Sequence, residues 1–308
     1  MNEDIKKVII CGLGAIGTAI GEKILDFAPD KLYALVDRER FERYSKKPRN
    51  FNGKILDFKY ILPEETSIKA DLVIIAVKQQ NLDEVILNLK NFITEKTTII
   101  SLLNGVTSEE VIGKTYSPSQ ILPAYYIGSS AIRHNNEIKH GGRATIVFGA
   151  KDVKSLPRIA PVEEFFKSTN ISYKIPEDIM RALWTKFMLN VACNQISAIL
   201  GLNFHQMHTS KNFKELATNV MKEVELCAKA EGIKNTETMI EEVFEHIQTI
   251  TPEGKTSMLQ DIEAGRKTEV ETFAGTVIKY GEKHNIPTPY NKALMSMINI
   301  ISEKALLI

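Results

Sequence analysis

The sequence has few cysteines, no long apolar run and no excess of either charge. Its three cysteines, Cys11, Cys193 and Cys227, are odd in number and lack C-x-x-C or Cys/His spacing. This argues against a disulfide framework and a zinc site, so we expect no bound metal and a reducing compartment, the cytoplasm. No run reaches about 18 consecutive apolar residues, so we expect no transmembrane helix and no membrane partner.

The charge balance also limits the partners. Lysine and arginine number 39 and aspartate and glutamate 38, for a net charge of +1. Such a balance argues against a nucleic-acid partner. The 308 residues, 44% of them hydrophobic, have an ordinary globular composition and suffice for two domains.

The first half of the chain alternates strand and helix signals. Helical patterns such as 15–28 and 82–93 separate continuously apolar, strand-like runs at 7–12, 32–37, 71–78 and 97–105. Continuous rather than alternating strands indicate a parallel sheet covered on both faces. Residues 120–150 have closely spaced strands with Asn-Asn and Gly-Gly turn signals, which predict an antiparallel addition to that sheet.

After Pro176 the strand signals stop. Helical periodicity then covers five segments: 177–200, 211–231, 236–250, 258–284 and 290–306. We therefore predict an α/β Rossmann-type N-terminal domain with a mostly parallel sheet, residues 1–176, and an all-α C-terminal domain, residues 177–308. Apolar surface on 211–250 would suit a homodimer as well as a core.

A glycine motif follows the first predicted strand and opens the first predicted helix. "CGLGAIG" has the G-x-G-x-x-G spacing, and Asp37 lies twenty residues beyond Gly17 at the end of the next strand. This context predicts a dinucleotide site. The alternative is a plain strand-turn-helix corner. We expect the cofactor to contact Gly12, Leu13, Gly14, Ala15, Ile16, Gly17 and Asp37.

The residues around Asp37 are compatible with either NAD or NADP as cofactor. A carboxylate suits the free 2′-hydroxyl of NAD and repels the 2′-phosphate of NADP. Arg38 follows at once, however, and could hold that phosphate. Lys78 and Asn104 end two predicted parallel strands, where open α/β sheets bind ligands. A surface lysine and a routine Asn-Gly turn are the alternative interpretations.

A polar row interrupts an apolar helix in "LWTKFMLNVACNQISAIL", residues 183–200. Lys186, Asn190 and Asn194 recur at steps of four, with Ser197 three further on, and so share one helix face. An amphipathic surface helix would show the same pattern. Further along, Ser257 and Gln260 have capping-box spacing. Glu269 lies twelve residues beyond Ser257, roughly 18 Å along an unbroken helix.

The chain resembles the ketopantoate reductase family, within the 6-phosphogluconate dehydrogenase-like group. The motifs that carry the resemblance are "GLGAIG", "AVK" at 76–78, "LLNG" at 102–105, "KFMLNVACNQISAI" at 186–199 and "SMLQDIEAGRKTE" at 257–269. The resemblance implies reduction of 2-dehydropantoate to (R)-pantoate, for pantothenate and coenzyme A synthesis. It implies NADP(H) as cofactor, with NAD(H) as the alternative because of Asp37.

The resemblance also implies roles for individual residues. Lys186 matches the catalytic general acid, and Glu269 a glutamate near that lysine and the substrate. The substrate-binding positions are Asn104, Asn190, Asn194 and Ser257, and the cofactor-binding positions include Lys78 and Asn104. Three departures stand out: Asp37 replaces a common basic residue, Asn81 falls where a glutamine is frequent, and Gln195 replaces a common proline.

Simple chemistry agrees with the role of Lys186. An ammonium can stabilise and protonate the carbonyl oxygen of a small 2-keto acid substrate. Apolar neighbours lower the pKa of a lysine, whereas a carboxylate such as Glu269 would raise it, so the net pKa does not follow from the sequence. Two other functions stay open. One is reduction of another branched 2-keto or 3-hydroxy acid, and the other is a non-catalytic dinucleotide-binding sensor.

Overall fold

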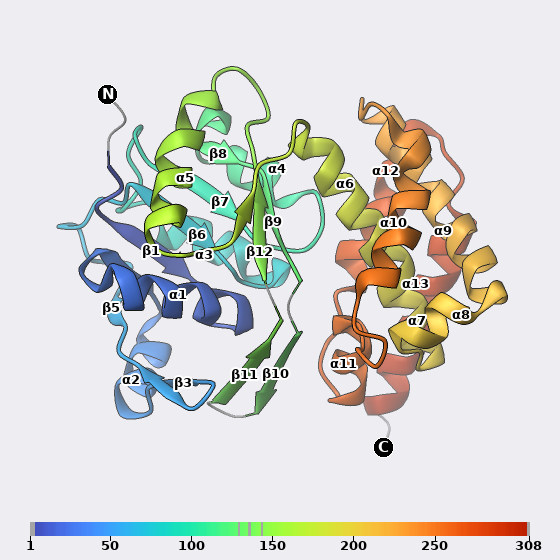
Figure 1. Cartoon of the computed structure of the whole chain (residues 1–308), viewed down its shortest axis with the longest axis horizontal. Helices are drawn as coiled ribbons and strands as arrows, with labels where there is room; N and C mark the ends of the chain where they lie inside the picture. Colours follow the sequence, from blue (N-terminus) through green and yellow to red (C-terminus); the bar gives the residue numbers. More distant parts are fainter. Residues whose placement is uncertain (1–3, 129, 135–136, 143, 307–308) are drawn as a thin grey trace. The chain divides into compact units, whose positions relative to one another are not determined.

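The structure, a computed structural model, describes residues 4–306 except 129, 135–136 and 143. It divides into two compact units, Met1–Ile179 and Met180–Ile308. Each unit has its own elements and buried side chains and is described by itself (Figure 1). Among the described residues, none of the helices has the length and apolarity needed to span a bilayer.

The first unit is built on a six-stranded parallel sheet, which confirms the predicted Rossmann-type fold. The strand order is β5-β2-β1-β6-β7-β8. The strands are β1 (Val8–Cys11), β2 (Leu32–Leu35), β5 (Lys59–Ile61), β6 (Leu72–Ile75), β7 (Thr98–Ser101) and β8 (Ile121–Leu122). The helices are α1 (Ala15–Phe27), α2 (Arg38–Lys46), α3 (Leu82–Asn88), α4 (Ser108–Gly113) and α5 (Ile159–Ser168).

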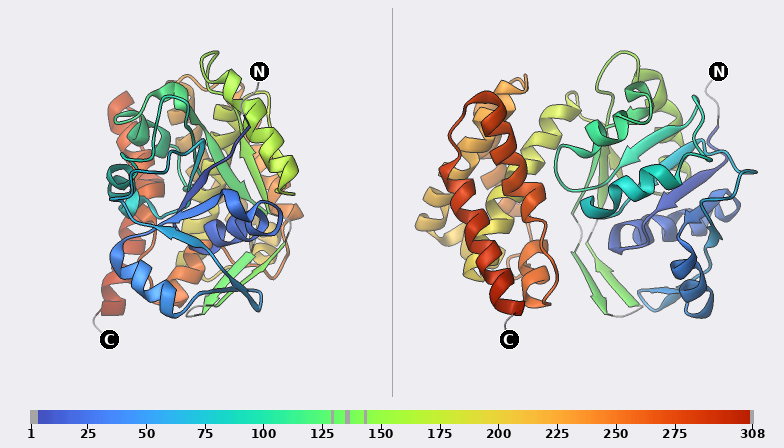
Figure 2. Two further views of the ribbon diagram at one scale, coloured as in Figure 1. Left: turned by 90° about the vertical axis from the view of Figure 1, so that its left-hand side faces the viewer. Right: turned by 180° about the vertical axis from the view of Figure 1, so that it is seen from behind.

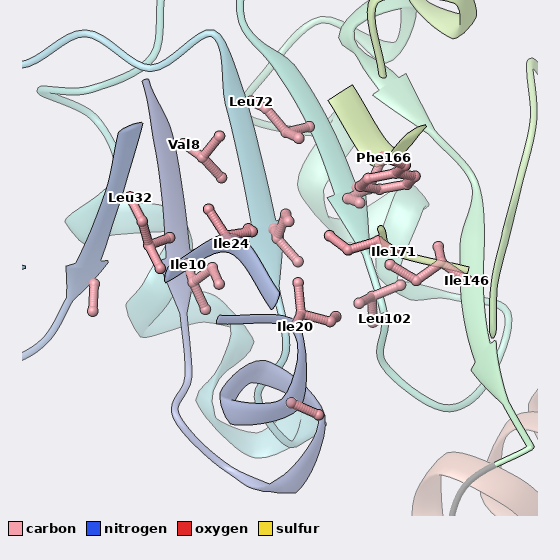
Figure 3. Close-up of a cluster of buried hydrophobic side chains, with 14 of the residues drawn as sticks. Val8, Ile10, Ile20, Ile24, Leu32, Leu72, Leu102, Ile146, Phe166 and Ile171 are labelled. Atoms are coloured by element: carbon pink, nitrogen blue, oxygen red, sulfur yellow. The ribbon is translucent and has the colours of Figure 1, made fainter. Parts of the chain in front are cut away.

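Both faces of the sheet are buried, which explains the continuous apolar runs. Side chains of β1 alternate between two clusters: Val8 and Ile10 pack with residues of α1 and α5, as Figure 3 shows in part. Ile9 and Cys11 pack on the opposite face with residues of α3 and α4, the cyan to green helices seen from behind in Figure 2. A strand with two buried faces has no polar alternation.

The antiparallel strands do not extend the parallel sheet, and that prediction is corrected. They form a four-stranded sheet, β10-β11-β3-β4, and a three-stranded sheet, β13-β12-β9. The strands are β3 (Arg49–Phe51), β4 (Lys54–Leu56), β9 (Ala124–Ile127), β10 (Ser130–His134), β11 (Glu137–Gly141), β12 (Thr145–Phe148) and β13 (Tyr173–Lys174). β10 pairs with β11 and β9 with β12, both antiparallel. The predicted Asn135-Asn136 turn lies outside the described residues.

The second unit is helical, as expected. Its helices are α6 (Ile179–Leu189), α7 (Gln195–Leu200), α8 (Phe204–Thr209), α9 (Lys211–Ala230), α10 (Met239–Thr249), α11 (Ser257–Glu263), α12 (Thr276–His284) and α13 (Pro289–Leu306). Short 3₁₀ turns occur in both units, at Pro29–Lys31, Gln79–Asn81, Pro118–Gln120, Leu156–Arg158 and Thr236–Thr238.

Two predicted helices are not regular, and each contains a π-helical turn. The helix expected at 177–200 changes at Asn190–Asn194 from α to π geometry before α7 begins. The helix expected at 258–284 is broken: α11 ends at Glu263, Gly265 takes a φ of +62°, and the chain re-enters a helix through the π turn Glu271–Gly275. The two π turns contact each other.

Candidate cofactor and substrate sites

The glycine motif forms a close-packed loop between β1 and α1. Gly12 has a φ of +97°, and a Cβ there would lie 2.5 Å from the carbonyl oxygen of Ala76. A Cβ on Gly17 would lie 1.9 Å from the carbonyl oxygen of Gly12. Neither position can hold a larger residue without moving backbone, so the loop requires both glycines.

The N-terminus of α1 fits a dinucleotide pyrophosphate. Gly14 is its N-cap, has no side chain to satisfy the first N–H groups, and no acidic residue occupies the first turn. A Cβ on Gly14 would meet no described atom within 4 Å, so this side of the loop can admit a ligand. Leu13, Ala15 and Ile16 complete the loop and the first turn. Exposed helix N–H groups and the helix dipole favour an anion here.

Arg49 braces this loop from behind, and sequence reasoning missed it. The side chain is buried, with 1% exposure, and its Nη2 donates to the carbonyl oxygen of Leu13. The guanidinium carbon also lies 5.1 Å from the ring centroid of Tyr44. Arg49 reaches the loop only through the tertiary position of β3, so no local pattern could have identified it.

Asp37 and Arg38 are held by different partners. Asp37 is the N-cap of α2: its Oδ1 accepts the Arg40 main-chain N–H at 2.6 Å, and its Oδ2 accepts from the Arg40 guanidinium. Arg38 instead pairs with Glu64, and these two side chains are 69% and 59% exposed. A capping carboxylate is worth about 1 kcal/mol, whereas an exposed ion pair is worth about 0–1 kcal/mol. Asp37 is therefore the better fixed of the two groups.

Lys78 and Asn104 lie beside the glycine loop at one edge of the sheet. Lys78 follows the end of β6 by three residues, and Asn104 follows the end of β7 by three. β6 pairs in parallel with both β1 and β7. The carboxyl ends of these neighbouring strands thus bring both residues and the loop to the edge where α/β sheets bind ligands.

A chain of hydrogen bonds closes the segment that carries Asn104. Ser101, at the end of β7, donates to the Ser108 hydroxyl at 2.8 Å, and Ser108 donates to Glu109 Oε2 at 3.0 Å. Burial raises the pKa of Glu109 to about 6. The two serines join the ends of the segment 101–108, which carries Asn104. Sequence reasoning did not single out these residues.

In the helical unit, Lys186 is half-buried on α6. Loss of hydration lowers its pKa to about 8, in the direction that apolar neighbours predict.

His246 on α10 lies near Lys186. Burial lowers the pKa of His246, and the Lys186 charge lowers it further. Arg181 binds Glu242 at 2.6 and 3.0 Å and so holds α10 beside α6. His246 was not predicted, because its proximity depends on this helix packing.

Asn190, Asn194 and Ser257 form one hydrogen-bonded cluster. Both asparagines are buried, at 5% exposure. Asn194 Nδ2 donates to Asn190 Oδ1 at 3.3 Å, and Asn194 Oδ1 accepts from the Ser257 hydroxyl at 3.0 Å and the Met258 N–H at 3.1 Å. The cluster joins the π turn to the start of α11 and orients the amide of Asn194.

The capping role predicted for Ser257 belongs to its neighbour. Thr256 is the N-cap of α11 and accepts the Leu259 N–H at 3.3 Å. Its hydroxyl lies 2.6 Å from that of Ser197, which donates to the Asn194 carbonyl. Ser197 is fully buried, so it joins α7 to α11 and supports the cluster from behind.

Glu269 precedes the second π turn rather than lying within a long helix. Its carbonyl oxygen accepts the N–H groups of Thr272 and Phe273 at 2.9 and 3.2 Å. The turn before it is closed by Arg266, whose Nε binds Asp261 at 2.7 Å. Because the helix is broken, the expected 18 Å helical rise between Ser257 and Glu269 does not apply.

Comparison with known proteins identifies the family. The family model described as ketopantoate reductase PanE/ApbA matches residues 8–152. The model of the ketopantoate reductase PanE/ApbA C terminal matches residues 178–302. A 2-dehydropantoate 2-reductase of Pyrococcus horikoshii is 26% identical over 296 residues, which cover 95% of this chain and 96% of that one.

Solved structures share the fold. A ternary structure of D-mandelate dehydrogenase with NADH and anilino(oxo)acetate has a TM-score of 0.87 at 19% identity, over 97% of this chain and 99% of that one. A dimeric ketopantoate reductase from Staphylococcus aureus has a TM-score of 0.77 at 23% identity, with the same coverage. With both family models matched, the chain belongs to the ketopantoate reductase family of NAD(P)-dependent oxidoreductases.

Proposed function

We propose that this enzyme reduces 2-dehydropantoate to (R)-pantoate, the step that feeds pantothenate and coenzyme A synthesis. The observation that carries the proposal is the hydrogen-bonded cluster of Asn190, Asn194 and Ser257, on a helical segment that also carries Lys186, a lysine with a lowered pKa, in a chain of this family. Such a segment supplies a proton donor and several groups that bind oxygen atoms.

In this proposal Lys186 is the general acid. When bound, the nicotinamide supplies the hydride, and negative charge develops on the substrate carbonyl oxygen. A lysine with a pKa of about 8 is largely protonated at neutral pH and releases its proton more readily than an ordinary lysine. In the same proposal Glu269 acts near Lys186 and the substrate. Asn190, Asn194 and Ser257 hold the substrate oxygens. Asn104 acts beside the nicotinamide.

For the cofactor, we propose that NADH is used at least as well as NADPH. Asp37 is fixed at the end of β2 as the cap of α2, and a carboxylate there favours a ribose 2′-hydroxyl over a 2′-phosphate. Arg38 would have to leave Glu64 to hold that phosphate. Because an exposed ion pair is weak, we expect slower but measurable NADPH activity.

The test is steady-state oxidation of NADH and NADPH with a panel of 2-keto acids. We expect the highest kcat/KM with 2-dehydropantoate. Lys186→Ala should bind NADH normally but lose roughly 100- to 10,000-fold in kcat, the usual contribution of a general acid. An unchanged kcat in this variant would exclude the proposed role, and equal kcat/KM for pyruvate would exclude the substrate.

A second candidate is the same chemistry on another branched 2-keto or 3-hydroxy acid. Its support is the likeness of the fold to D-mandelate dehydrogenase, whose name gives a different substrate. Both candidates use the same polar cluster, so the substrate panel distinguishes them.

We also propose a homodimer, as in the Staphylococcus aureus protein, which is named as dimeric. Leu226 on α9 and Met297 and Ile300 on α13 are exposed apolar side chains of the helical unit, at 51%, 46% and 62% exposure. Light scattering on the purified protein would test this, and a monomer at micromolar concentration would contradict it.

A further inference from the structure

Gln195 is a fully buried amide directly behind the π turn. In a regular α-helix its main-chain N–H would donate to the carbonyl oxygen of Val191, four residues back. Here the N–H donates to Ala192 instead. The side-chain Nε2 of Gln195 donates to the Val191 carbonyl at 2.8 Å. The side chain of Gln195 thus bonds the carbonyl that its own main-chain N–H would bond in an α-helix.

The π turn changes how the polar row is aligned. In an α-helix each step of four residues overshoots a full turn by about 40°, so a row at 186, 190 and 194 would wind around the helix. A π turn bonds to the fifth residue and holds roughly one residue more per turn. The step from Asn190 to Asn194 then falls short of a full turn, which brings Asn194 back toward the line of Lys186.

A second set of buried groups holds Gln195 itself. Its Nε2 also lies 3.3 Å from Asn291 Oδ1, and Asn291 Nδ2 donates to Glu223 Oε2 at 2.7 Å. Glu223 accepts the N–H groups of Tyr290 and Asn291 at 2.8 and 3.0 Å, in the first turn of α13. A carboxylate at a helix N-terminus is a stable anchor. The Gln195 amide is therefore oriented from α13 and α9.

The side-chain oxygen of Gln195 indicates which part of the amide matters. Among the described residues, no donor reaches Gln195 Oε1, although that atom is buried. An unsatisfied buried oxygen is unfavourable, and an apolar side chain of similar size would fill the same space without it. The useful part of Gln195 is therefore its amino group.

We propose that Gln195 is a positioning residue that maintains the π turn and thereby aligns Asn194 with Lys186. The inference rests on the proposed function, in which these side chains bind and protonate the substrate. It assigns the alignment to one hydrogen bond, from Gln195 Nε2 to the Val191 carbonyl.

The first test is Gln195→Met, which keeps the length of the side chain and removes its donor. We expect kcat/KM for the 2-keto acid to fall roughly 100-fold, the loss that a misplacement of about 1 Å can cause. The dissociation constant of NADH, which binds the other unit, should stay within twofold. A crystal structure of the variant should show 190–194 as α-helix, with the residue 195 N–H on the Val191 carbonyl.

The matched control is Thr169→Val, which also removes a buried donor: the Thr169 hydroxyl donates to the carbonyl oxygens of Phe165 at 2.8 Å and Phe166 at 3.4 Å in the first unit. It should leave kcat/KM within threefold of the wild type. Rescue comes from Gln195→Glu: a buried carboxyl stays protonated near neutral pH and can donate to Val191. The ratio of its kcat/KM to that of the wild type, measured at the same pH, should approach one at low pH and fall as the pH rises.

The outcomes separate the two proposals. If the wild-type protein reduces no 2-keto acid, the proposed function is wrong. The role of Gln195 is then tested by the crystal structure alone: a π turn retained in Gln195→Met would contradict it. Active wild type with an equally active Gln195→Met variant overturns the inference alone. An equal loss in Thr169→Val and Gln195→Met also overturns it, because general destabilisation would then explain both.

Discussion

Lys186 carries its charge in surroundings that disfavour the charged form, with a pKa of about 8. The acid must be protonated when hydride arrives, so we predict that kcat/KM for keto-acid reduction falls as the pH rises through about 8. The measurement is a pH–rate profile of the wild type and Lys186→Arg. The arginine stays protonated, so that variant should be slower but lack the alkaline decline. The same decline in both would assign it to another group.

The same pKa has the opposite effect on folding. Between about 8 and the ordinary value of 10.5, the unfolded chain keeps a proton that folded Lys186 has lost. Stability from this group therefore increases with pH across that window. We predict that Lys186→Met raises the melting temperature more at pH 7 than at pH 10. A larger gain at pH 10 would contradict the depressed pKa.

The carboxylates of Asp37 and Glu64 should each favour NADH over NADPH. Removing the Asp37 carboxylate with Asp37→Ser, which keeps a capping hydroxyl, should lower the KM for NADPH by removing its repulsion of the 2′-phosphate. Glu64→Gln should act in the same direction by releasing Arg38. Steady-state kinetics with both cofactors checks this, with Glu39→Gln, a neighbouring acid in the first turn of α2, as control. An NADPH KM unchanged in both variants would contradict the assignment.

In the loop between β1 and α1, one glycine should matter for folding and another for cofactor binding. Gly17→Ala would place a Cβ 1.9 Å from the Gly12 carbonyl oxygen, so we expect a lower melting temperature. Gly14→Ala meets no described atom within 4 Å, so it should fold normally but weaken NADH binding, because its methyl group faces the ligand. Thermal unfolding and NADH titration measure the two effects. Equal melting temperatures for both variants would contradict the close packing at Gly17.

Periodicity predicted where most helices lie but not their irregular turns. The helices at 211–231 and 290–306 were predicted within a few residues of α9 and α13. The π turns at Asn190 and Glu271 were not, because they depend on hydrogen bonds and contacts with other helices. Gly265 lies at the break in 258–284 and takes a φ of +62°, which glycine adopts without strain.

At the scale of the whole molecule, the two units have separate cores, so a ligand of one unit should protect that unit first. NADH at 100 times its dissociation constant stabilises the form that binds it by about 2.7 kcal/mol. We predict that hydrogen exchange slows in β1, α1 and β2 much more than in α9 and α13. Exchange measured with and without NADH checks this. Greater protection of α9 and α13 would place the cofactor elsewhere.

Spacing between near neighbours was enough to predict the parallel sheet, the glycine loop and the helical segment that carries Lys186, Asn190 and Asn194. Strand and helix geometry convert such spacing into regular elements with buried faces. The resemblance added chemical roles to the same positions.

How those positions are held depends on contacts that form only when the chain folds. Four features were not predicted: Arg49 behind the glycine loop, the two separate mixed sheets, Thr256 paired with Ser197, and Gln195 bonded to Val191 and Asn291. Most of these features join residues far apart in the chain, and the bond from Gln195 to Val191 accompanies a π turn where an α-helix was predicted. Local spacing contains no information about such partners, because they meet only when the helices and strands pack.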